Sequence, residues 1–278
     1  MKEMFDGISY SCSKLITKTY STSFAAGIFF LDKRLHRPLY SVYAFVRLAD
    51  EIVDSFEGYD KKVLLERFRN DTAHAIASKI SLNPVLNLFQ KSVHTYKIDN
   101  DLIETFLNSM EMDLKQHDYS RYDFDQYILG SAEVVGLMCL RVFTENNDEL
   151  YQHLKPMAMK LGAAFQKVNF LRDMQDDYKV LNRMYFPQIN FNSFSEKDKA
   201  AIENEIRNDF SEALDGIKLL PPSSRLGVYI AYRYYKALLS KISRLSANRI
   251  KEERVRVGND KKFRLMIHSC LQHHLNLI

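Results

Sequence analysis

The stretch YAFVRLADEIVDSF (43–56) has the apolar spacing of an α-helix and places two carboxylates on one face of that helix. Asp50 and Asp54 lie four residues apart, so their side chains are neighbours on the helix surface. Arg47 precedes Asp50 by three residues and falls near the same face. Like charges at this spacing disfavour a helix by about 0.2–0.5 kcal/mol, which indicates that a cation compensates them.

A second stretch, FQKVNFLRDMQDDYKVLNRMYFP (165–187), has a similar pattern. Its polar side chains follow a three-four-four spacing, which forms one stripe on a helix: Gln166, Asn169, Asp173 and Asp177. Apolar residues crowd both carboxylate pairs, whereas an ordinary solvated face lies opposite the apolar stripe. Arginines such as Arg47 and Arg172 bind diphosphate through two hydrogen bonds, and Mg²⁺ takes one or two carboxylates together with phosphate oxygens. The two helices therefore predict a magnesium site for a diphosphate.

The rest of the chain predicts an all-α protein with a single domain over 1–278. Glycine (9) and proline (6) are scarce, and apolar residues recur at three- to four-residue spacing almost throughout. We expect helices near 9–29, 34–56, 60–79, 84–96, 99–115, 124–145, 149–181, 196–219, 223–249 and 260–276. We also expect the prolines at helix ends, namely Pro38, Pro84, Pro156, Pro187 and the pair Pro221-Pro222.

The composition narrows the class of function. Lysine and arginine (39) barely exceed the acids (35), a net charge of +4 that argues against a nucleic-acid partner. Three widely spaced cysteines, no signal-peptide pattern and no apolar stretch of about 20 residues predict a cytoplasmic protein. The basic segment 244–264 leaves three interpretations open: a solvated helix, passage of diphosphates into the site, or weak peripheral contact with anionic lipid. The sequence leaves the oligomeric state open.

Five segments in order resemble the squalene/phytoene synthase family of head-to-head isoprenyl transferases. They are YSTSF (20–24), YAFVRLADEIVD (43–54), YILGSAEVVG (127–136), QKVNFLRDMQDD (166–177) and RMYFP (183–187), and a basic tail at 254–262 follows them. The resemblance covers nearly the whole chain. It implies an isoprenoid-synthase helical fold around a central apolar cavity.

The resemblance also implies roles for individual residues. Asp50, Asp54, Asp173 and Asp177 would hold Mg²⁺, for which Mn²⁺ could substitute. The residues expected to act in catalysis are Tyr43, Arg47, Tyr127 and Arg172. Those expected to bind substrate are Ser21, Ser23, Arg47, Gln166, Asn169, Arg172, Arg183 and Lys262. Tyr43, Tyr127 and Gln166 would line the reaction chamber, and Arg183 and Lys262 would lie near its mouth. Three residues depart from the family pattern: Glu51 replaces a frequent Asp, Thr22 replaces a Lys that some members have, and Glu133 replaces a Gly. The carboxylate of Glu133 is either a functional addition or part of a salt bridge.

The activity that the resemblance implies is the joining of two prenyl diphosphates through a cyclopropylcarbinyl diphosphate. We expect phytoene synthase acting on geranylgeranyl diphosphate, with squalene or dehydrosqualene synthase acting on farnesyl diphosphate as the alternative. The absence of a Gly-x-Gly-x-x-Gly fingerprint favours products made without NADPH, although relatives that use NADPH lack it too. A non-catalytic helical assembly factor is the alternative of another class, and the retained aspartates argue against it. The small residues Ala25, Ala26 and Gly27 either border the cavity floor or permit close helix packing.

Overall fold

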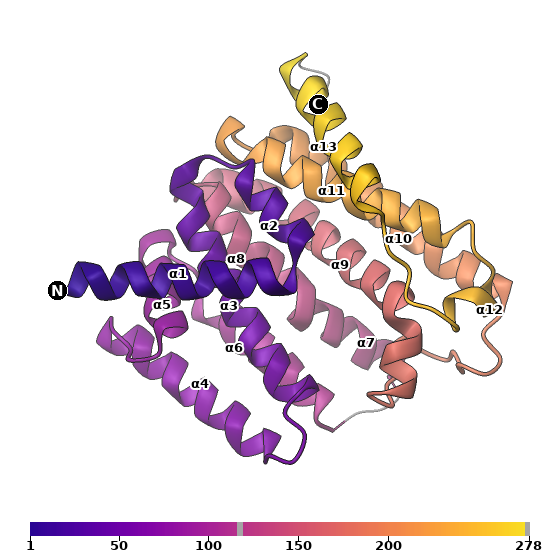
Figure 1. Ribbon diagram of the computed structural model, residues 1–278, viewed down its shortest axis with the longest axis horizontal. Coiled ribbons are helices and arrows are strands. Elements are labelled where there is room, and N and C mark those ends of the chain that lie inside the picture. Colours follow the sequence, from indigo (N-terminus) through magenta and orange to yellow (C-terminus); the bar gives the residue numbers. More distant parts are fainter. Residues whose placement is uncertain (116–118, 276–278) are drawn as a thin grey trace.

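The computed structural model describes residues 1–115 and 119–275, and within them it contains helices and no β-strand (Figure 1). The predicted all-α fold is confirmed. The helices are α1 (Lys2–Tyr20), α2 (Thr22–Phe29), α3 (Lys33–Asp54), α4 (Lys61–Ser78), α5 (Pro84–Tyr96), α6 (Asn100–Asp113), α7 (Arg121–Ile128), the π-helix η1 (Leu129–Glu133), α8 (Val134–Phe143), α9 (Asp148–Lys179), α10 (Glu196–Leu219), α11 (Pro222–Ile242), α12 (Ala247–Ile250) and α13 (Asn259–His274).

Capping side chains decide where two of the predicted helices end. The helix predicted over 9–29 is two helices, because Ser21 is extended (φ −144°, ψ 96°) and its hydroxyl accepts a hydrogen bond from the amide of Phe24 at 3.1 Å. The helix predicted over 223–249 ends at Ile242, and the hydroxyl of Ser246 starts the short α12. Serines inside an apolar pattern can thus divide a helix that periodicity alone would continue.

The prediction that prolines mark helix ends is right for some and wrong for two. Pro84 and Pro222 begin α5 and α11, where the missing N–H costs nothing. Pro38 lies inside α3 and Pro156 inside α9. Pro38 is buried, so packing there offsets the local cost of ~3 kcal/mol. Pro156 has no N–H to donate to the carbonyl of Gln152, four residues earlier in the helix. Gln152 is exposed, so its carbonyl can bond water instead.

A π-helix interrupts the continuous run α7–η1–α8 in the middle of the molecule. At Gly130, an added Cβ would lie 2.5 Å from the Cβ of Ser109 on α6, and at Gly162 on α9 it would lie 2.6 Å from the carbonyl oxygen of Ala132. Helices on both sides therefore approach the π-helix as closely as glycine allows. The run 121–143 is long and apolar enough to cross a membrane, with a mean hydropathy of 1.3, but 61% of it is buried as a core helix.

Two apolar cores share this run. One joins α3, α4, α5, α6 and α8, and the other joins α7 to α12. Helix α9 packs against α8, η1, α10 and α11, while α3 packs against α1, α5 and α8. The two helices that carry the aspartate pairs are thereby held on opposite sides of one interior space, from residues 120 positions apart in the chain (Figure 1).

Candidate active site

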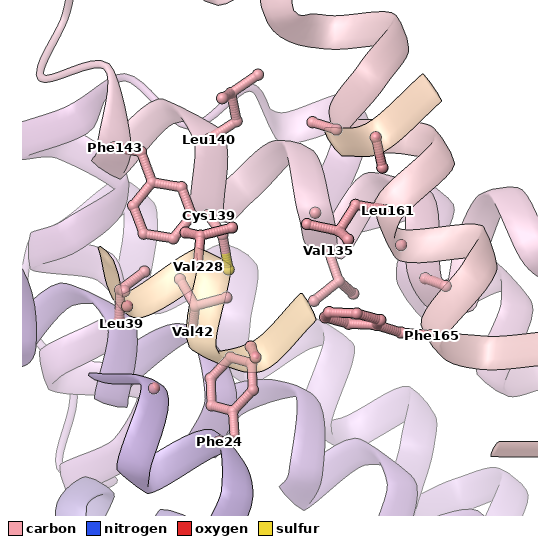
Figure 2. A pocket seen from close by; sticks show the side chains of 18 of the residues that line it. Phe24, Leu39, Val42, Val135, Cys139, Leu140, Phe143, Leu161, Phe165 and Val228 are labelled. Carbon is pink, nitrogen blue, oxygen red and sulfur yellow. The ribbon is translucent and has the colours of Figure 1, made fainter. Parts of the chain in front are cut away.

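An apolar cavity of about 260 Å³ lies between α2, α3, α8, α9, α10 and α11. Figure 2 shows apolar side chains from these helices, among them Phe24, Val42, Phe143, Leu161 and Val228, directed into this common space. The polar groups in its wall are few and come from one end of α3 and α9 together with their neighbours: Tyr43, Ser131, Gln166, Asn169 and Tyr235. A chamber of this kind suits a long hydrocarbon with one polar end.

Both aspartate pairs continue the cavity wall at its polar end. Along α9 the wall runs from Leu154 to Asn169, and Asp173 and Asp177 follow on the next two turns. Along α3 the wall includes Val46, and Asp50 follows one turn later. The two helices therefore present apolar side chains along the chamber and carboxylates at its mouth.

The carboxylates of the two helices are close enough to perturb one another. Burial and the neighbouring charge of Asp54 raise the pKa of Asp50 well above its usual range. Burial, Asp173 and then Asp54 across the site raise the pKa of Asp177 to about 8. The charge of Asp54 on α3 acts on Asp177 on α9, so the two pairs lie near one another in a site with an excess of negative charge.

Arginines neutralise three of the four carboxylates. Arg47 donates to Asp50 at 3.3 Å and also bonds Glu51. Arg172 and Arg254 both bond Asp173, each through its Nε at 2.8 Å. A diphosphate would attract such arginines, and here each of them pairs with a carboxylate of the protein.

Two buried polar atoms at the site have no partner within the described part of the chain. One is a donor, Arg47 Nε, and the other is an acceptor, Asn169 Oδ1. A buried polar atom without a hydrogen bond costs about 1–3 kcal/mol unless a ligand or water satisfies it. A diphosphate would satisfy the donor, and a metal ion would satisfy the acceptor.

This donor set suits Mg²⁺ that is shared with a diphosphate. Among the described residues, no three carboxylate, histidine or cysteine side chains lie close enough to enclose a metal by themselves. Mg²⁺ does not need such a cage, because it typically takes one or two carboxylates and fills its octahedron with phosphate oxygens and water. Asp50, Asp54, Asp173, Asp177 and Asn169 are the residues that could hold it.

The sequence analysis did not identify Asp113, which lies at the end of α6 behind the metal-site candidates. Its carboxylate accepts hydrogen bonds from the hydroxyls of Tyr127 at 2.6 Å, Tyr119 at 3.1 Å and Tyr185 at 3.2 Å. Arg183 lies 3.8 Å away and also donates to Asp54 at 2.6 Å. Burial raises the pKa of Asp113 to about 6, although Arg183 and Tyr127 oppose the rise. The sequence does contain a sign of this role. Asp113 follows Met110 by three residues, so it lies on the apolar face of its helix, where a carboxylate is unusual.

Tyr127, predicted as a catalytic residue, occupies a different place from that expected, and Arg183 is buried. Tyr127 was expected to line the chamber, but it is buried and bonds Asp113 behind the wall. It is held there by ring contacts with Tyr119, Phe170 and Tyr185. Arg183 was expected near the cavity mouth, and it lies there beside Asp54, where it is buried between Asp54 and Asp113. Aromatic packing, which periodicity does not reveal, accounts for the position of Tyr127.

The remaining predicted residues lie along the wall or its mouth. Gln166 donates to Ser131 at 3.3 Å, and the ring of Tyr43 lies 4.8 Å from that of Phe24. Burial raises the pKa of Tyr43 to about 12, so its hydroxyl stays protonated. Ser21 caps α2, and Ser23 lies in its first turn.

The amine of Lys262 lies 3.3 Å from the hydroxyl of Thr22 at the start of α2. Some family members are expected to have a lysine at the position of Thr22. In this protein Lys262 on α13 brings a positive charge to that position. Glu133 is absent from the cavity wall. Burial raises its pKa, and its nearest charges include Lys167 and Asp209, which form an ion pair of 2.7 Å.

The raised pKa values predict how pH affects the metal-free protein. The folded protein retains protons on Asp50 and Asp177 that the unfolded chain, with carboxyl pKa near 4, has already released. Stability of the metal-free protein should therefore fall as pH rises from about 4 to 8. Mg²⁺ binds the deprotonated carboxylates, so less Mg²⁺ should be needed at pH 8 than at pH 6.

Thermal melting with increasing Mg²⁺ and inorganic diphosphate at pH 6, 7 and 8 measures both effects. An equal Mg²⁺ requirement at pH 6 and pH 8 would contradict the assignment of these two carboxylates.

Comparison with known proteins gives the family. The profile described as squalene/phytoene synthase matches residues 17–260. The chain is 23% identical to 4,4'-diapophytoene synthase of Staphylococcus haemolyticus, over 92% of this chain and 94% of that protein. It is also 23% identical to phytoene synthase of Arthrospira platensis, over 85% and 84%. A crystal structure of a dehydrosqualene synthase superposes with a TM-score of 0.81 at 21% identity, covering 98% of both chains.

The expectation of an enzyme is confirmed, and the alternative of a non-catalytic assembly factor is set aside. Members of the matched family are prenyltransferases. The fold, the cavity with an acidic mouth and the matched profile agree: the chain belongs to the squalene/phytoene synthase family, whose members condense two prenyl diphosphates head to head.

Proposed function

We propose that this protein is a phytoene synthase that joins two molecules of geranylgeranyl diphosphate. The observation that carries the choice of a C20 substrate is the length of the cavity along α9. Asn169 at its polar end and Leu154 at its far end both line it. At ~1.5 Å per residue, this stretch of helix is about 22 Å long.

The length of the chamber can be compared with that of a prenyl tail. At ~1.2 Å per bond of an extended chain, the 16-carbon main chain of a geranylgeranyl group is about 18 Å long, and the 12-carbon main chain of a farnesyl group is about 13 Å. The longer tail fits within the chamber.

The chain's residues divide the reaction between them. Arg47 and Arg172 are proposed to release Asp50 and Asp173 and to bind the diphosphates through their paired donors. Mg²⁺, when bound, supplies positive charge that stabilises the departing diphosphate. The aromatic faces of Tyr43, Phe165 and Tyr235 border the cavity, and they can stabilise carbocations by cation–π attraction. The apolar wall keeps water from these cations.

Each half-reaction releases one diphosphate and one proton. The first forms the cyclopropylcarbinyl diphosphate, and the second ionises it and joins the two former head carbons. No reductant is needed for this outcome, so we propose that the enzyme works without NADPH. A dehydrosqualene synthase acting on farnesyl diphosphate is the second candidate, favoured by the similarity to 4,4'-diapophytoene synthase and to the dehydrosqualene synthase structure.

The experiment is a competition between the two substrates. Purified protein with Mg²⁺ should convert an equimolar mixture of C15 and C20 diphosphates mainly to a C40 hydrocarbon, identified by mass spectrometry. Ala158→Phe should reverse this preference by about tenfold or more. The new ring would stand 11 residues from Asn169, at a depth of about 16 Å, which admits the C15 tail and obstructs the C20 tail.

The matched control is Ala26→Phe. Ala26 lies on α2 near the cavity but outside its wall, so the same added ring should leave the product ratio unchanged. This placement favours helix packing as the role of the small residues on α2. Gly27 supports it too, because an added Cβ there would lie 3.4 Å from the carbonyl oxygen of Gly227 on α11. A C30 product from the unmodified protein would refute the choice of substrate.

A further inference from the structure

Helix α13 carries a row of exposed apolar side chains that the proposed reaction does not use. Phe263, Ile267, Leu271 and Leu275 follow at four-residue intervals and are 58%, 44%, 56% and 67% exposed. The opposite face of α13, with Ser269 and Leu265, packs on α11. In Figure 1 the C-terminal part of α13 projects from the top of the molecule.

Positive charge accompanies the apolar row. Lys261 and Arg264 are exposed on the same helix, while Asp260 is the acid in its first turn. A helix that combines an exposed apolar row with basic neighbours is typical of proteins that lie on the surface of an anionic membrane.

A groove beside α13 provides a second, independent observation. It has a volume of about 380 Å³ between α10, α11 and α13, and Arg233 and Lys236 line it. Arg233 donates to Gln272 and to the hydroxyl of Tyr229, and Lys236 donates to the hydroxyl of Tyr232 at 3.3 Å. Within the described residues these two cations bond neutral groups and form no ion pair. Two cations without a counter-charge in one groove fit an anion such as the phosphate of a lipid headgroup.

The basic segment considered from sequence is a weaker candidate for lipid contact. Arg249 pairs with Glu252 and Glu253, and Arg254 pairs with Asp173 at the active site. These arginines therefore have counter-charges inside the protein. Among the described residues, Arg233 and Lys236 on α11, and Lys261 and Arg264 where the basic segment enters α13, form no ion pair.

We propose that the outer face of α13 and the adjoining α11–α13 groove form a docking surface for an anionic lipid bilayer. The apolar row enters the interface, and Arg233 and Lys236 bind headgroup phosphates.

The test is sedimentation of the full-length protein with vesicles, in the absence of substrate. We expect binding to phosphatidylcholine vesicles that contain about one third phosphatidylglycerol, and at least tenfold weaker binding to pure phosphatidylcholine. Ile267→Ser combined with Leu271→Ser should weaken binding to the anionic vesicles about tenfold or more. Arg233→Gln combined with Lys236→Gln should do the same.

Controls come from the region of α4 and the loop after it, at the other end of the molecule (Figure 1). Leu82→Ser, at a side chain that is 92% exposed, and Lys62→Gln should leave binding unchanged. Activity with detergent-dispersed substrate should be the same in all variants. Equal vesicle binding by the α13 variants and the controls would overturn the proposal, as would no binding by the unmodified protein.

A change in mass measured by light scattering for the α13 variants alone would also overturn it, since it would assign the surface to a second copy of the chain. Because vesicle binding is measured without catalysis, a failure here leaves the proposed function intact, and a different hydrocarbon product leaves this proposal intact.

Discussion

Asp177→Asn should lower kcat by about 10²–10³-fold and at the same time leave the melting temperature unchanged or higher. The loss is expected because a carboxamide cannot supply the charge that holds Mg²⁺ at the departing diphosphate, and removing one such electrostatic contact typically costs about 3–4 kcal/mol. The gain in stability is expected because burial and Asp173 raise the pKa of Asp177 to about 8, so its charged form is unfavourable without metal. Steady-state kinetics and melting curves at pH 8 measure both.

The matched control for this substitution is Asp176→Asn. Asp176 is the preceding residue on α9, about 100° around the helix from Asp177 and outside the polar stripe. The same chemical change there should alter kcat by less than about threefold. Asp50→Asn on the facing helix should reproduce the large loss, because its pKa is raised by the same kind of surroundings. Full activity in Asp177→Asn, or an equal loss in Asp176→Asn, would contradict a metal site built from these stripes.

Asp113→Ala should destabilise the protein by about 3–5 kcal/mol, because it leaves Arg183 and three tyrosine hydroxyls without their shared acceptor. For a chain of this size that corresponds to a fall in melting temperature of about 6–20 °C. The milder Asp113→Asn removes the charge and keeps one acceptor oxygen for the hydroxyls, in place of the two that Asp113 offers. It should stay folded and raise the Mg²⁺ concentration needed for half-maximal activity by about tenfold.

The reason for the metal effect is the position of Arg183 between two carboxylates. In the protein its guanidinium is shared by Asp54 and Asp113. Without the charge of Asp113 it pairs with Asp54 alone and competes with the metal there. Binding of Mn²⁺, followed by electron paramagnetic resonance, separates this effect from a general loss of activity. Tyr119→Phe, which removes one hydroxyl and no charge, is the control and should leave metal affinity unchanged.

The sequence predicted the parts of this site that depend on the spacing of residues within one helix. The stretches 43–56 and 165–187 predicted two helices whose polar faces hold Asp50, Asp54, Asp173 and Asp177, and α3 and α9 have those faces. Spacing suffices there because a helix fixes which side chains are neighbours within a few turns. Order and spacing of the five motifs likewise indicated the family, which the profile match confirms.

Contacts between distant segments required the tertiary structure. Asp113 ends α6, and Arg183 lies 70 residues later in the loop after α9. Helical periodicity within either segment does not reveal that these two side chains meet. Tyr127 was expected on the cavity wall but lies behind it, because ring packing with Tyr185 and the hydrogen bond to Asp113 turn it inward. The structure also locates the helix breaks at Ser21, which caps α2, and after Ile242, before the cap that Ser246 gives to α12. The sequence by itself determined the helices, their polar faces and the family, because these follow from local periodicity and motif order. Only the tertiary structure decided that Arg183 pairs with Asp54 and Arg254 with Asp173, because these ion pairs join segments that are far apart in the chain.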